Sequence, residues 1–167
     1  MCWQDIAIGE ELTIYFSYPF STTAERQTIY LKTHRFVCSC EVCSASPAKI
    51  KLSDTRRLGL KQAIDAIGVL GLSNPSMTIA LARQIIATCK LEKIVVQTAG
   101  IADIAVDVCS AFCDFDSSRK WAELALKLHL LEAGETEESE MSRKYIKDPT
   151  SNTISRMGKK ALFLGGP

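Results

Sequence analysis

The stretch FVCSCEVC, residues 36–43, places three cysteines within six positions: Cys38, Cys40 and Cys43. A closed structural zinc site needs four ligands in a tetrahedron, with each thiolate sulfur about 2.3 Å from the metal. Cysteines two or three residues apart on a tight loop can turn their sulfurs inward, so this spacing favours zinc over a metal-free, cysteine-rich turn. The stretch therefore predicts a zinc loop that is one ligand short.

The fourth ligand has several candidates. His34 is close in sequence, although we expect it to belong to the end of a helix, and Cys2 is a second candidate. The third is a residue outside this chain. Cys89, Cys109 and Cys113 lie in apolar, helical surroundings, where free cysteines usually act as small buried hydrophobes.

Composition is that of an ordinary globular protein and points to no charged partner. The chain has 167 residues, of which 47% are hydrophobic and 23% charged, and its net charge is only +1. This balance excludes a global bias toward nucleic acid, and we expect neither nucleic acid nor a membrane as a direct partner. The acidic N-terminus does not look like a signal peptide, so we expect an intracellular protein, in the nucleus and/or the cytoplasm, with free or metal-bound thiols.

The region before residue 50 combines β-like and turn residues. The run EELTIYF, residues 10–16, alternates apolar and polar positions, which predicts a β-strand. Thr22 and Glu25 have the spacing of a capping box, which predicts a helix from there to about Lys32. The segment SASPAKIK, residues 44–51, has the composition of a linker.

The region after residue 50 shows helical periodicity. We expect one helix capped by Ser53-Asp54 and ended by Gly71, and a second opened by Asn74-Pro75. Two more follow, at about 97–113 and about 118–133. Helices that recur about every twenty residues suit stacked hairpins of the TPR kind, but an ordinary helical bundle fits equally well. The run ETEESE reads as a short solvated segment, and residues 150–167 lack periodicity, so we expect partial disorder there.

Two motifs resemble a known family. The segment DIAIGEELTIYF, residues 5–16, resembles the closing motif of the SET domain, D-I-x-x-G-E-E-L-T-I-x-Y. Residues 23–43, TAERQTIYLKTHRFVCSCEVC, resemble the stretch that leads into the post-SET zinc loop. The helical second half is similar in architecture to the C-terminal region of the SET and MYND family and its fungal relatives.

The resemblance implies an α+β fold in four regions. Residues 1–35 would be a small, β-containing SET remnant, and residues 36–50 a post-SET zinc loop with a linker. Residues 51–149 would be an all-α, TPR-like region, and residues 150–167 a partly disordered tail. The family consists mainly of protein-lysine N-methyltransferases, which transfer a methyl group from S-adenosylmethionine. The expected cofactors are thus Zn²⁺ and, where a SET core is supplied, S-adenosylmethionine, and the expected partner is a histone or another lysine-containing protein.

The resemblance also assigns roles to single residues. Cys38, Cys40 and Cys43 would be three of four zinc ligands, the fourth coming from an Asn-His-x-Cys motif that this sequence lacks. Phe36 falls at the aromatic position that helps to cover the adenine of the cofactor. A core aromatic residue beside the zinc loop is the other interpretation. Tyr18 falls at a position that can line the lysine channel, and a partly exposed turn tyrosine is the alternative.

Two departures from the family pattern count against activity. The position of the catalytic tyrosine is occupied by Phe16, which lacks the hydroxyl group. Tyr15 cannot replace it, because adjacent residues of a strand point to opposite faces. The sequence also lacks the rest of the SET core, so we expect a fragment or an incomplete gene product that is inactive as an isolated chain. The alternative is a non-catalytic, zinc-stabilised helical module that binds a partner protein.

Overall fold

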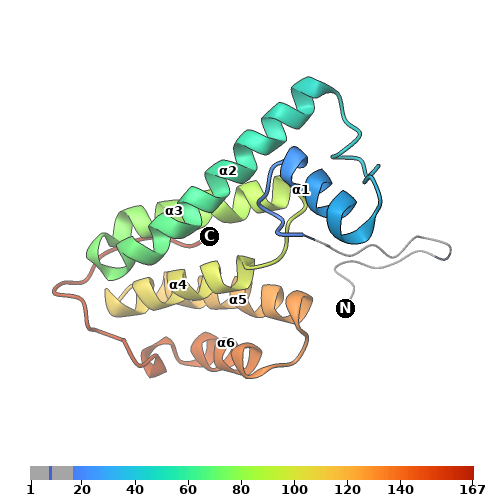
Figure 1. Cartoon of the computed structure of the whole chain (residues 1–167). Helices are drawn as coiled ribbons and strands as arrows, with labels where there is room; N and C mark the ends of the chain where they lie inside the picture. Colours follow the sequence, from blue (N-terminus) through green and yellow to red (C-terminus); the bar gives the residue numbers. More distant parts are fainter. Residues whose placement is uncertain (1–7, 9–16) are drawn as a thin grey trace. The chain divides into compact units, whose positions relative to one another are not determined.

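The computed structural model of the chain describes residue 8 and residues 17–167 (Figure 1). Its regular elements are six α-helices, one π-helical segment and two short 3-10 helices. In chain order they are α1 (Thr23–Ile29), η1 (Tyr30–His34), α2 (Pro47–Leu70), η2 (Gly71–Ser73), α3 (Pro75–Leu91), α4 (Thr98–Ala111), α5 (Phe115–Glu132), α6 (Glu137–Lys147) and η3 (Pro149–Ser151). Within the described ranges, no helix combines the length and the apolar character that crossing a membrane requires.

The expected α+β fold is wrong for the described part of the chain, where every regular element is helical. The physical reason is the periodicity of the sequence, because apolar side chains recur there at three- and four-residue intervals and the backbone groups pair within helices. The predicted strand at residues 10–16 lies outside the described residues, as do Phe16 and Cys2.

The chain divides into two compact units, and the boundary falls within α2. Of the described residues, one unit comprises residue 8 and residues 17–63, and the other comprises residues 64–167. The cysteine loop belongs to the first unit, and α3 to α6 belong to the second.

The start of α1 confirms the predicted capping box. The Thr22 side chain accepts a hydrogen bond from the Glu25 amide, and the Glu25 carboxylate accepts one from the Thr22 amide at 2.7 Å. Two of the otherwise unpaired groups at the helix end are satisfied in this way. The α-helix then widens into the π-helical turn η1, which ends where Arg35 adopts a left-handed conformation with φ of 57°.

Helix α2 begins six residues earlier than Ser53, where the sequence predicted its cap. It starts at Pro47, whose missing N–H costs nothing at the first helical position. Asp54 caps a different helix instead, since its Oδ1 accepts hydrogen bonds from the amide and the hydroxyl of Thr23, at 2.7 and 2.9 Å. The predicted end of this helix is confirmed, because α2 stops at Leu70 and Gly71 follows with φ of 41°.

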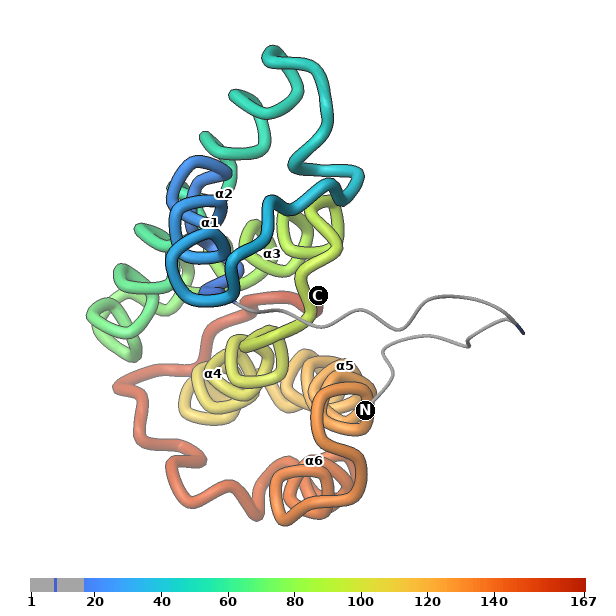
Figure 2. Tube along the Cα trace, turned by 45° about the vertical axis from the view of Figure 1, so that its right-hand side comes forward, coloured from blue at the N-terminus to red at the C-terminus, as the bar shows by residue number. Residues whose placement is uncertain are grey.

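The second unit packs α3 to α6 around an apolar core, with α4, α5 and α6 lying side by side (Figure 2). The buried side chains at the α3–α4–α5 interfaces are mostly small, which lets the helices approach closely. They include Ile79, Ala82, Ile85, Ala102, Ala105, Cys109, Ala122 and Ala125, and Trp121 is the largest. Cys89 and Cys109 are buried among them, as the sequence predicted. Whether the pairs repeat in the TPR manner stays a prediction.

Helix termini in this unit follow local rules. The Asn74 side chain accepts the Met77 amide ahead of Pro75, which confirms the predicted start of α3. The run ETEESE, expected to be a solvated segment, contributes the first turn of α6, which Thr136 caps. Acidic side chains are favourable there, because the N-terminal end of a helix carries a partial positive charge.

Candidate metal centre

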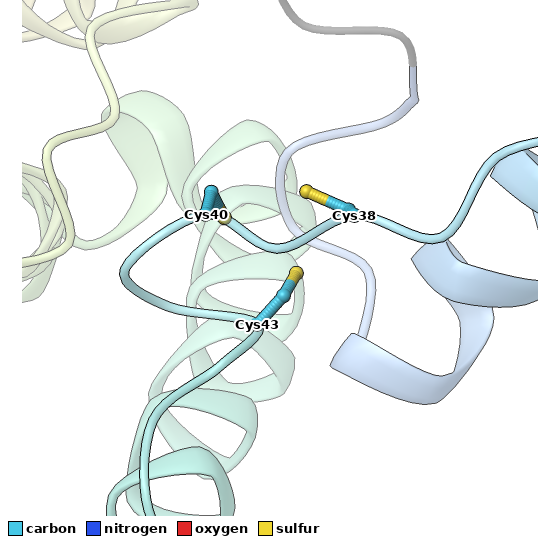
Figure 3. A group of neighbouring side chains, drawn as sticks. All are labelled: Cys38, Cys40 and Cys43. Carbon is cyan, nitrogen blue, oxygen red and sulfur yellow. The ribbon is translucent and has the colours of Figure 1, made fainter.

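The sulfur atoms of Cys38, Cys40 and Cys43 lie within 4.8 Å of one another (Figure 3). A tetrahedral zinc ion with Zn–S distances of 2.3 Å holds its sulfurs about 3.8 Å apart, so a contraction of about 1 Å or less suffices to bind it. Among the described residues this group has no fourth member, and His34 is not part of it. Because Cys40 is exposed, a fourth ligand from elsewhere can reach the open side of the group.

Hydrogen bonds within the loop favour the thiolate form of Cys40. Burial acts to raise the pKa of its thiol, but backbone amides of Cys43 and Val42 donate hydrogen bonds to the sulfur, as do the neighbouring thiols, and the net effect lowers the pKa. Burial raises the pKa of Cys43 to about 11, against the lowering effect of a hydrogen bond from Arg26. Amides that point at a sulfur stabilise its negative charge, so the loop is prepared to hold a thiolate or a metal–thiolate group.

Arg26 supplies a buried positive charge beside the sulfurs. Its side chain is only 5% exposed, and its Nη2 lies 3.8 Å from the Cys43 sulfur. The guanidinium also donates to the Ser21 carbonyl oxygen and, at 3.0 Å, to the Thr23 hydroxyl. A Zn²⁺ ion with three thiolates carries one unit of negative charge, which the arginine offsets. Arg26 therefore favours the metal-bound, thiolate form of the group, although the pKa of the Cys43 thiol without metal is raised.

Gln27 fixes the entry to the loop. Its Nε2 donates to the Cys38 carbonyl oxygen at 2.7 Å, and its Oε1 accepts the Cys38 amide at 2.9 Å. Both polar groups of one backbone residue are thus held by one side chain from α1. This two-point contact sets the direction of the Cys38 sulfur before any metal binds.

Phe36, the aromatic residue that precedes the loop, is also held in place by its neighbours. Phe36 is half-buried and stacks on Tyr30, with ring centroids 5.2 Å apart and planes at 11°. Tyr30 is buried, and its hydroxyl accepts a hydrogen bond of 2.9 Å from Ser17. The π-helical turn and the left-handed Arg35 bring the Phe36 ring back onto Tyr30.

Tyr18 stands at a turn and is 44% exposed. Its ring meets the buried Phe20 edge to face, with centroids 5.1 Å apart. The described residues therefore place Tyr18 at the surface of the first unit, and a role in a lysine channel stays a prediction.

The roles of three residues near this site are visible only in the structure. Arg26, Gln27 and Asp54 act through contacts made across 17, 11 and 31 positions of the chain. Arg26 and Gln27 do fall within the E-R-Q segment that precedes the cysteines, which is the only sequence signal for them. Asp54 reads as an ordinary helix cap, and only the packing of α2 against α1 shows which helix it serves.

Comparison with known proteins adds one curated relative. The chain is 32% identical over 165 residues to the histone-lysine N-methyltransferase set5 of Schizosaccharomyces pombe (strain 972 / ATCC 24843), an alignment that covers 96% of this chain and 51% of the relative. The chain thus spans about half the length of the curated relative that it matches. No family model and no solved structure matches the chain. The chain is a distant homologue of a histone-lysine methyltransferase.

Proposed function

We propose that this chain is the C-terminal portion of a SET-type protein-lysine N-methyltransferase that uses S-adenosylmethionine, and that the isolated chain is inactive. One observation carries the proposal: three clustered thiols follow the E-R-Q segment in a chain that resembles a histone-lysine methyltransferase along nearly its whole length. The expected substrate is a histone or another lysine-containing protein, met in the nucleus and/or the cytoplasm.

In this proposal Cys38, Cys40 and Cys43 hold a structural zinc ion, and a fourth ligand comes from outside the described residues. The zinc ion has no part in the chemistry. It closes the loop and fixes the chain on either side of it, because a structural metal contributes its binding energy to folding.

Phe36 would then cover the adenine of S-adenosylmethionine. Its half-buried ring stacks on Tyr30 and lies beside the His34 ring, with centroids 6.3 Å apart, which makes an aromatic surface of the kind that flat rings pack against. S-adenosylmethionine supplies the methyl group when bound. An uncharged lysine nitrogen would form the new bond to the methyl carbon as the carbon–sulfur bond breaks, its electron pair leaving with the sulfur of S-adenosylhomocysteine. The proton of the methylated lysine would pass to solvent. Tyr18 would line the channel through which the lysine enters.

Phe16 limits the rate in this proposal, because the tyrosine hydroxyl of the family is absent at that position. Positioned hydrogen-bond groups supply much of the rate of an enzyme, so their loss is costly. We expect Phe16→Tyr to raise methyl transfer, provided that the rest of a SET core is present.

The test supplies that core. The half of the S. pombe relative that this chain does not cover is fused to the chain, and transfer of tritiated methyl groups to histone is measured. We expect activity in the fusion, a several-fold rise with Phe16→Tyr, and its loss with Cys40→Ser, which removes one zinc ligand. The isolated chain should show no turnover. Clear turnover by the isolated chain would refute the predicted inactivity, and a folded, zinc-loaded fusion without activity would refute the proposed enzyme.

The second candidate is a non-catalytic, zinc-stabilised helical module that binds a protein. Phe16 and the all-helical described region favour it. It predicts that the fusion stays inactive with Phe16→Tyr while residues 64–167 still capture a partner.

A further inference from the structure

The last residues of the chain lie against α3 and the start of α5 in the second unit, where side chains of these helices bind their main chain. Residues 158–167 have no helix or strand, and the segment Leu162–Gly166 runs past Arg83 of α3 and the start of α5. The sequence predicted partial disorder after residue 149, because no periodicity is visible there. In the structure, the Leu162 amide donates to the Phe112 carbonyl oxygen, and the main chain of residues 164–166 makes hydrogen bonds with the side chains of Arg83, Asp114 and Trp121.

Three side chains, Arg83, Asp114 and Trp121, bind the main chain of this segment, and together they are called the clamp. Asp114 Oδ2 accepts the amides of Leu164 and Gly165, at 2.6 and 3.1 Å. Trp121 Nε1 donates to the Gly165 carbonyl oxygen at 3.1 Å. Arg83 donates to the carbonyl oxygens of Leu164 and Gly166, at 3.0 and 2.8 Å. Every one of these bonds ends on the main chain of the tail.

The clamp therefore binds the main chain of the segment and not its side chains. Phe163, the largest side chain of the segment, is 90% exposed and takes no part. Burial acts to raise the pKa of Asp114, but the amides of Leu164 and Gly165 and the hydrogen bonds of Ser117 outweigh it, and the pKa stays below its ordinary value. The carboxylate is thus ionised when it accepts the two amides, which makes both bonds strong.

One position of the segment is strained for any residue but glycine, and the next is tightly packed. A Cβ atom on Gly165 would lie 2.7 Å from Arg83 Nη2, and Gly165 has φ of 82°, which other residues adopt only with strain. A Cβ atom on Gly166 would lie 3.1 Å from Cδ of Lys120. These contacts thus select glycine at position 165, after the half-buried Leu164, and a small residue at position 166, where a larger one would have to displace the Lys120 side chain.

We propose that Arg83, Asp114 and Trp121 form a peptide-binding site for a Leu-Gly-Gly segment, which the chain's own tail occupies and which a partner protein with an exposed Leu-Gly-Gly segment takes over when the tail leaves. A side chain that binds only main-chain atoms makes the same contacts with any peptide that can adopt the conformation. The tail has a high effective concentration, so it blocks the site until it is displaced. This site uses no cysteine and no residue of the proposed enzyme, so its test is independent of the proposed function.

The experiment uses the full chain with Gly165→Val, a β-branched residue that cannot adopt the positive φ at this position and so releases the tail. A fluorescent peptide with the sequence of residues 158–167, GKKALFLGGP, is titrated and its anisotropy is measured. We expect saturable binding to this variant and at least tenfold weaker binding to the unaltered chain, whose site is filled. A peptide that ends in Leu-Ala-Ala should bind at least tenfold more weakly.

Arg83→Ala in the Gly165→Val background is the matched control. Arg83 is exposed, so its loss should abolish binding without unfolding the protein. Absence of saturable binding to a Gly165→Val chain with an unchanged circular dichroism spectrum would overturn the proposal, as would equal affinity for the Leu-Ala-Ala peptide. If Gly165→Val does not fold, the milder Gly165→Ala/Gly166→Ala chain replaces it. Absence of saturable binding, or equal affinity for the Leu-Ala-Ala peptide, would overturn the proposal there as well.

Discussion

Removal of the Gln27 side chain should weaken zinc binding without removing a single metal ligand. Gln27 makes two hydrogen bonds to the backbone of Cys38, at 2.7 and 2.9 Å. A typical protein hydrogen bond is worth about 1 kcal/mol net. Gln27→Ala should therefore destabilise the metal-binding conformation of the loop by up to about 2 kcal/mol. A free-energy change of about 1.4 kcal/mol is tenfold in affinity, which predicts a zinc Kd raised about 10- to 30-fold.

The assay is a competition for zinc against a chromophoric chelator at neutral pH. Gln84→Ala is the matched control, since Gln84 is an exposed glutamine on α3 and lies in the other unit. It should leave the Kd unchanged. A Kd for Gln27→Ala within a factor of two of the parent chain, at unchanged helix content, would show that the loop needs no such anchor and would refute the reasoning.

Two further predictions concern stability. Asp54→Ala removes the acceptor for the amide and hydroxyl of Thr23 and should cost about 1–2 kcal/mol of unfolding free energy in urea, whereas Asp54→Asn, which keeps an acceptor, should cost less; equal losses would argue against the capping role. Because the folded-state pKa of Asp114 is lowered, its contribution to stability is complete above the unfolded-state pKa of about 3.9 and is lost as the pH falls through the lower folded value. Asp114→Asn should therefore lower the melting temperature at pH 6 and do so less at pH 3, and an effect that is independent of pH would contradict this assignment.

The sequence predicts the helical elements well where local rules decide them. Thr22 with Glu25, Asn74 with Pro75, and Gly71 mark helix ends by their own chemistry, and the structure confirms all three. Prediction from the sequence fails where the composition of a helical segment is not typical of a helix. The Ser-Pro-Ala-Lys stretch has the composition of a linker, yet Pro47 begins α2. The acidic side chains of residues 135–140 are exposed, as predicted, but their composition does not reveal that the run opens α6.

The candidate site, too, could be predicted from the sequence only in part. The spacing of Cys38, Cys40 and Cys43 predicts their clustering, because six residues of loop cannot carry the sulfurs far apart. The anchoring contacts of Arg26 and Gln27 depend on how α1 meets the loop, and no local pattern encodes that. The tail is similar, since its main chain is held by residues up to 83 positions away and has no periodicity of its own.

Cobalt(II) titration of the purified chain, followed by displacement with zinc, tests the central claim most directly. The clustered thiols predict one equivalent of metal, with the charge-transfer absorption of three cobalt–thiolate bonds and loss of the signal in Cys40→Ser. Uptake that persists undiminished in Cys40→Ser, or no thiolate absorption at saturating cobalt, would contradict the assignment of these three cysteines to one metal ion.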